Sequence, residues 1–112
     1  MNVKDTERRL TDEQPELTEK IRRGERATAI LGDELFKSAV RVARERAVSE
    51  FEGSDLGDDK TRLRARLRLE ALTDIVSELH SVMTDGEVAE KKLGMLKSAL
   101  AAAKQRLLRR VA

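Results

Sequence analysis

Apolar residues recur every three or four positions through the second half of this chain, and this repeat limits the fold more than any other feature. Between residues 60 and 84 the repeat consists of Ala65, Leu69, Leu72, Val76, Leu79 and Met83. Beyond residue 87 it continues with Ala89, Leu93, Leu96, Leu100, Ala103 and Leu107. Alternating steps of three and four place such side chains along one seam of an α-helix, as in coiled coils. The sequence therefore predicts an all-α fold with long helices.

Turn and cap residues divide the chain into separate predicted helices. Gly32 can end one helix and Asp33 can cap the next, so this pair predicts a boundary between two helices. Residues 53–59 hold two glycines and three aspartates, a composition that predicts a loop. Asp85-Gly86 is a third such signal and predicts the end of a helix. We expect an antiparallel helical hairpin over about 33–52 and 60–84. Asp58 or Asp59 should cap its second helix, and N- and C-terminal helices should flank it in bundle or coiled-coil-like packing.

The length of 112 residues favours a single domain. Residues 1–14 are polar and lack a sustained apolar stripe, so we expect a flexible N-terminal arm. Pro15 suits the first position of a helix, which predicts one helical domain over 15–112. Gly24 inside its first helix either weakens that helix or lets a neighbouring helix approach closely. The basic, alanine-rich helix predicted over 87–112 either packs back on this domain or projects from it.

The residue types needed for most catalytic and metal sites are missing from the sequence. There is no cysteine for a disulfide or thiolate zinc site, and His80 is the only histidine. No glycine-rich phosphate loop occurs, and the adjacent carboxylates Asp58 and Asp59 are better explained as helix caps than as cation ligands. We therefore expect no enzyme activity, catalytic residue, metal, cofactor or small-molecule substrate. No apolar run reaches the roughly 18 residues of a membrane span, so we expect no membrane association.

The chain holds few bulky side chains with which to close a core. Phe36 and Phe51 are its only aromatic residues. In a lone hairpin the outer apolar residues of helix 60–84 would stay in water, and each exposed leucine forfeits roughly 1.5–3 kcal/mol of burial. We therefore predict a homo-oligomer or a larger protein assembly, with a monomeric bundle of three or four helices as the alternative. The predicted interaction face consists of Phe36, Val40, Phe51, Leu69, Leu72, Val76, Leu79 and Met83.

Two groups of basic residues suggest a second class of function, because clustered cations bind nucleic-acid phosphates or acidic protein surfaces. The first group alternates with apolar residues and consists of Arg62, Arg64, Arg66 and Arg68. The second lies near the C-terminal end and includes Lys104, Arg106, Arg109 and Arg110. Solvated helix faces and favourable interactions with a helix dipole explain the same residues without a ligand. A nucleic-acid-binding packaging or regulatory accessory is thus the alternative function, and a regulator that sequesters a protein partner is a third.

The order of several segments resembles a group of small helical proteins encoded among the head-morphogenesis genes of tailed bacteriophages. The similar segments are Gly24-Glu25-Arg26-Ala27, residues 31–39, an acidic loop, residues 62–79 and Asp85-Gly86, within about residues 20–95. Phe51 matches an aromatic position of that pattern, whereas the basic C-terminal segment lies outside it. The resemblance implies a virion-associated or assembly protein without a catalytic residue, made in the cytoplasm of the producing cell. Its implied partners are other copies, the portal or the capsid.

Overall fold

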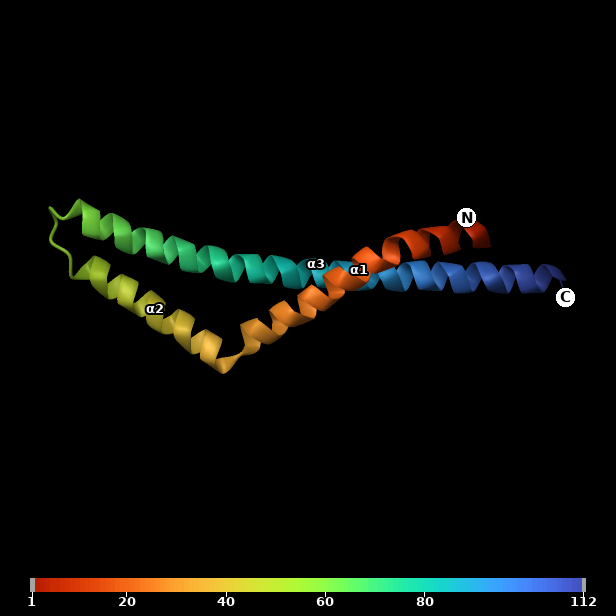
Figure 1. Cartoon of the computed structure of the whole chain (residues 1–112), viewed down its shortest axis with the longest axis horizontal. Helices are drawn as coiled ribbons and strands as arrows, with labels where there is room; N and C mark the ends of the chain where they lie inside the picture. Colours follow the sequence, from red (N-terminus) through yellow and green to blue (C-terminus); the bar gives the residue numbers. More distant parts are fainter. Residues whose placement is uncertain (1, 112) are drawn as a thin grey trace. The chain divides into compact units, whose positions relative to one another are not determined.

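The computed structural model describes residues 2–111, which form three α-helices and no strand. These are α1 (Val3–Gly32), α2 (Glu34–Glu52) and α3 (Asp59–Val111), shown in Figure 1. The all-α prediction is confirmed. The helices contribute to two compact units. The hairpin unit is Ala27–Ser81, and the terminal unit joins the residues up to Arg26 with those from Val82 onward.

The hairpin unit confirms the predicted helical hairpin. Within this unit α2 and the beginning of α3 run antiparallel from their connecting loop (Figure 1). Asp33 caps α2, since its side chain accepts a 2.8 Å hydrogen bond from the backbone N–H of Phe36. Of the two candidate caps for α3, Asp58 fills the role and accepts from the Thr61 N–H at 3.1 Å. Such caps satisfy backbone donors that the first turn of a helix leaves unpaired.

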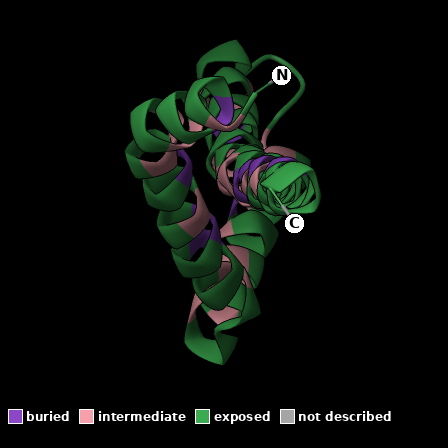
Figure 2. Ribbon diagram, turned by 90° about the vertical axis from the view of Figure 1, so that its right-hand side faces the viewer, coloured by how far each residue is buried: buried purple, intermediate pink, exposed green. Residues whose placement is uncertain are grey.

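The terminal unit has a small apolar core between α1 and the last part of α3. Leu17, Ala89 and Leu96 are its buried members. Leu10, Ile21 and Leu93 pack against them. The second apolar repeat of the sequence thus supplies much of this core, and residues 87–111 pack back on α1 within the unit. Burial is confined to narrow stripes of the ribbons in Figure 2, as expected for helices that contact few neighbours.

The N-terminal residues differ from the expected flexible arm, because α1 begins at Val3. The Asn2 side chain accepts a 2.9 Å hydrogen bond from the Asp5 N–H, and Thr6 is only 1% exposed. Thr6, Leu10, Glu13 and Leu17 follow steps of four, three and four, so the repeat is present with polar residues at alternate positions. The expected helix start at Pro15 was wrong, since Pro15 lies inside α1. The single domain predicted over 15–112 stays a prediction.

The predicted helix end at Asp85-Gly86 was wrong. Helix α3 continues through both residues as far as Val111, so 60–84 and 87–112 are not separate helices. No residue in the described chain has a positive φ, so neither Gly86 nor Gly32 adopts the left-handed conformation of a glycine helix stop. Gly86 is buried instead, and its role is a contact with α1 that is described below.

Candidate protein-interaction surfaces

Within the hairpin unit, the predicted seam of α3 is partly covered by the chain itself. Ala65 is fully buried, and Leu69, Leu72, Val76 and Leu79 are of intermediate exposure. Met83, the last seam residue, belongs to the terminal unit and is also of intermediate exposure. The more exposed apolar residues lie off the seam, and these are Leu63, Leu67 and Ile75, at 55%, 53% and 54% exposure. The seam therefore supplies packing inside the chain, and the off-seam residues supply apolar surface.

A solvent-open groove of about 640 Å³ lies in the hairpin unit. Its apolar lining includes three residues of the predicted interaction face, Phe36, Val40 and Val76, together with Leu31 and Val48. Phe51, Leu69, Leu72, Leu79 and Met83 do not line it. Leu72 instead borders a smaller hollow of about 360 Å³ with residues that include Ala43 and Ile75. The structure thus brings together only part of the predicted face.

The rim of this groove carries more positive than negative charge. Its charged lining residues are Lys37, Arg41, Arg44 and Glu45. Lys37 lies 3.6 Å from Glu34, and Arg41 lies 3.9 Å from Glu45, both as exposed pairs within α2. Arg44 forms no ion pair with any residue in the described part of the chain. Because exposed pairs of this kind are weak, the rim remains available to a negatively charged ligand.

The predicted cationic run on α3 is largely occupied by contacts with α2 inside the hairpin unit. Glu50 accepts from Arg64 Nη2 and from Arg68 Nη1, each at 2.7 Å. The Glu50 side chain is 22% exposed, and the two arginines are 62% and 58% exposed. One carboxylate thus joins two guanidinium groups across the hairpin, a geometry that makes strong charge-assisted hydrogen bonds.

The remaining two arginines of the run also have partners. The Arg62 guanidinium carbon lies 4.7 Å from the ring centre of Phe51, within the range of a cation–π contact. Arg66 lies 3.2 Å from Glu70 one turn further along α3. Phe51 lies on α2 and Arg62 on α3, so this contact joins the two helices of the hairpin. The run therefore contributes to folding of the hairpin and offers few free cations to phosphate.

The C-terminal cations lie in a different environment, at the end of the terminal unit. Arg106 and Arg110 line a hollow of about 630 Å³ together with Lys4 and Leu107. Among residues 2–111, Lys4, Arg106, Arg109 and Arg110 form no ion pair. Lys104 approaches Glu7 only to 4.0 Å. The C-terminal group thus keeps free charge that the run on α3 lacks.

Glu13 is an electrostatic contact in the terminal unit that sequence reasoning missed. Its Oε1 lies 3.1 Å from Lys92 Nζ, and its Oε2 lies 3.4 Å from Arg9 Nε. The Lys92 ammonium beside it lowers the pKa of the Glu13 carboxyl, although partial burial opposes this effect. The signal in the sequence was the place of Glu13 in the repeat between Leu10 and Leu17.

Gly24 and Gly86 form the closest approach between helices of the terminal unit. A Cβ atom added to Gly24 would lie 2.8 Å from the Cα of Gly86. A Cβ added to Gly86 would lie 2.8 Å from the Cα of Gly24 and 3.0 Å from the carbonyl oxygen of Lys20. The backbones of α1 and α3 are therefore in direct contact, and of the two roles considered for Gly24 the close approach is the one observed.

Residues 2–111 contain no group of three or more His, Asp or Glu side chains placed to hold a metal ion. None of the described helices is long and apolar enough to cross a membrane. His80 lines the groove of the hairpin unit beside Val76. A scan against protein-family models and searches among curated proteins and solved structures find no match to this chain.

Proposed function

We propose that this protein is a non-enzymatic assembly protein that binds other protein chains through the apolar surface of its hairpin unit. The groove lined by Phe36, Val40 and Val76 is the observation that carries the proposal, because it opens apolar side chains to solvent. A second hollow on the same unit combines an apolar lining with three cations, and its lining residues are Leu63, Leu67, Ala71, Lys60, Arg64 and Arg68. Contiguous apolar surface of this kind marks sites of protein interaction.

The resemblance to helical proteins of phage head gene modules supports a virion as the setting of this assembly role. Partners in that setting are other copies of the chain, the portal or the capsid. Mass spectrometry of purified particles from a phage that encodes the chain tests this setting. We expect the chain at a fixed copy number per particle, and its absence from washed particles contradicts the virion assignment.

Sedimentation velocity over a concentration series tests the assembly role itself. We expect the mean mass of the 112-residue chain to rise with concentration, because apolar surface is buried between copies. A single monomer boundary at every concentration up to millimolar contradicts self-assembly.

Nucleic-acid binding is a second candidate function, and the free cations of the terminal unit favour it. Lys4, Arg106 and Arg110 border one hollow and have no ion-pair partner among residues 2–111. We expect a shallower salt dependence when Arg106, Arg109 and Arg110 are replaced with glutamine. The slope of log affinity against log salt concentration should fall in magnitude by roughly 0.9 for each phosphate that the protein no longer neutralises. Fluorescence anisotropy of labelled duplex DNA measures this slope. Arg66→Gln, which changes a paired cation, is the control, and absence of binding at low salt contradicts this function.

A further inference from the structure

We propose that the loop between α2 and α3 of one copy docks in the groove of the hairpin unit of a second copy, with Leu56 as its apolar anchor. The proposal rests on the assembly role proposed above and specifies its contact. The two surfaces differ, so the association is head-to-tail.

The loop presents an exposed apolar side chain among carboxylates. Leu56 is 89% exposed, the highest value among the large apolar residues that the structure describes. Its acidic neighbours are Glu52, Asp55, Asp58 and Asp59. Leu56 has almost no packing inside the chain, so its side chain is available for insertion into a partner.

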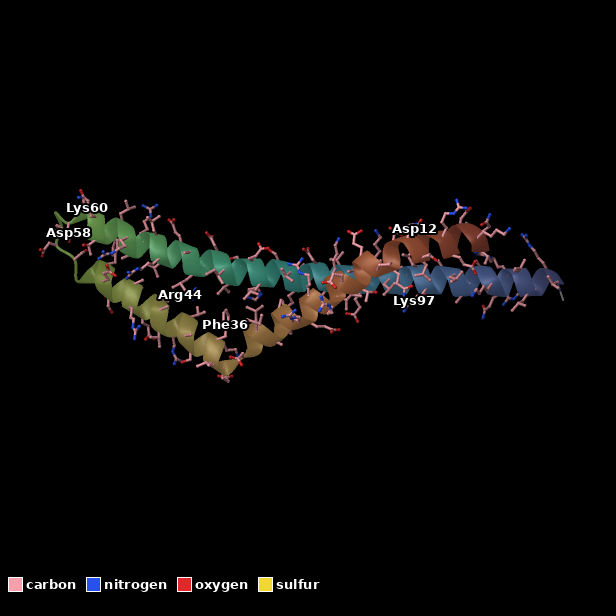
Figure 3. The ribbon with its side chains drawn as sticks, in the orientation of Figure 1. Asp12, Phe36, Arg44, Asp58, Lys60 and Lys97 are labelled. Atoms are coloured by element: carbon pink, nitrogen blue, oxygen red, sulfur yellow. The ribbon has the colours of Figure 1, made fainter. Side chains whose placement is uncertain are left out.

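The same chain does not bring this loop to its own groove. Residues 53–58 connect α2 directly to α3, and the groove is lined by α2 residues from Phe36 to Ser49. Hydrogen bonds fix the loop at its beginning and end, since Ser54 Oγ donates to the Phe51 carbonyl at 2.6 Å and the Asp58 N–H donates to Asp55 at 2.9 Å. Figure 3 labels Asp58 at the loop and Phe36 at the far end of α2. The occupant must therefore come from another copy.

Charge complementarity favours a contact of loop with groove over a two-fold contact of groove with groove. The groove combines an apolar lining with Lys37, Arg41 and the unpaired Arg44 at its rim, and the loop combines Leu56 with carboxylates. A two-fold contact of groove against groove would place two basic rims together, and like charges at an interface disfavour association. A head-to-tail contact leaves one free loop and one free groove at the ends of every growing chain, and it closes into a ring or extends as a filament.

Two variants that disable opposite surfaces test the proposal. Leu56→Asp removes the anchor, and Val48→Asp adds a charge to the groove at a residue that is already 38% exposed. By sedimentation velocity, each variant alone should remain monomeric at concentrations where the wild type associates. An equimolar mixture should form a dimer and nothing larger, because only the intact groove of the first variant and the intact loop of the second remain.

Leu35→Asp is the matched control, since Leu35 is 79% exposed and does not line the groove. It should associate like the wild type, and circular dichroism of all variants checks their helix content. If Leu56→Asp associates as strongly as the wild type, or if the mixture of Leu56→Asp and Val48→Asp stays monomeric, the proposal is overturned while the assembly role stands. A wild type that is monomeric throughout overturns both this contact and self-assembly of the chain.

Exchange of charge gives an independent test of the same contact. Arg44→Glu and Asp55→Lys should each weaken association at low salt, and combining them in one chain should restore it at least tenfold relative to Arg44→Glu alone. If Arg44→Glu abolishes association and Asp55→Lys changes nothing, the groove binds a different acidic segment and the loop assignment is overturned.

Discussion

Gly24 and Gly86 set how closely α1 and α3 approach in the terminal unit. A glycine in a helix interior costs roughly 1 kcal/mol relative to alanine, so two of them in long helices require a compensating gain. The gain here is direct backbone contact, because an added Cβ on either residue would lie 2.8 Å from the Cα of the other. Both residues are buried, so a methyl group has no free space to enter.

Gly24→Ala or Gly86→Ala should therefore destabilise the protein in spite of alanine's higher helix propensity. We expect a net loss of up to about 2 kcal/mol, since overpacking a filled contact typically costs 1–3 kcal/mol and alanine's propensity regains about 1 kcal/mol. Urea denaturation followed by circular dichroism measures the change. Gly94→Ala is the matched control, because a Cβ added there would point into open space, and it should stabilise the helix. Equal stabilisation by all three substitutions contradicts the close contact.

The Glu13 contact makes stability depend on pH. Its folded-state pKa is lowered chiefly by Lys92, so the ionised carboxylate stabilises the folded state above the unfolded pKa. This contribution should be lost progressively as the pH falls from the unfolded pKa of about 4.3 through the lowered folded-state pKa. In thermal melts between pH 3 and 7, Glu13→Gln should melt below the wild type at neutral pH, and this difference should shrink as the pH falls toward 3. Glu25→Gln on α1 controls for loss of one negative charge, and an unchanged gap at pH 3 refutes this assignment.

Helix α3 owes its continuity to its contacts with the other helices. Its residues bury one side against α2 in the hairpin unit and against α1 in the terminal unit. Asp85-Gly86 lies within this helix although it has the composition of a turn, because the Gly86 backbone packs on α1. Helical stability in proteins comes mostly from such packing rather than from intrinsic propensity.

The link between α2 and α3 through Glu50 should contribute to stability of the hairpin. Glu50→Gln removes the charge shared by Arg64 and Arg68, and after allowance for their exposure we expect a loss of about 1 kcal/mol. Chemical denaturation at low salt measures it, and 1 M salt should reduce the difference between variant and wild type. Glu45→Gln, which changes an exposed 3.9 Å pair within α2, is the control and should have little effect.

The chain as a whole exposes apolar side chains while its net charge is only +2. Leu35, Leu56, Leu108 and Met95 are among the large apolar residues that are well over half exposed. A small net charge gives little electrostatic repulsion between copies, so association through apolar surface meets little opposition. The charges that are present are unevenly placed, with carboxylates in the loop and cations around the groove.

The melting temperature of the chain should therefore rise with protein concentration. Association stabilises the folded state by mass action, because the unfolded chain does not present the same surfaces. Differential scanning calorimetry between about 10 μM and 1 mM should show an upward shift of several degrees for the wild type. Val48→Asp should show no such shift, and a concentration-independent wild-type transition argues against self-association.

The helical hairpin and its caps were predictable from the sequence because they depend on neighbouring residues. Steps of three and four identify the more buried side of α3 from Ala65 to Leu79. The caps Asp33 and Asp58 each accept a hydrogen bond from the backbone N–H only three residues further along the chain. The beginning of α1 was missed because Thr6 and Glu13 occupy repeat positions where apolar residues were sought. Of the predicted interaction face, only Phe36, Val40 and Val76 line the main groove.

Periodicity and capping are set by hydrogen bonds and side chains within one helical turn, so the sequence alone determined that this chain is helical and where its hairpin turns. Whether Gly86 ends a helix or lets two helices touch depends on Gly24, which is remote in the sequence. Whether Arg64 and Arg68 are free cations depends on Glu50 across the hairpin. Tertiary structure decided both, because the energy of each contact depends on a partner that local sequence does not specify.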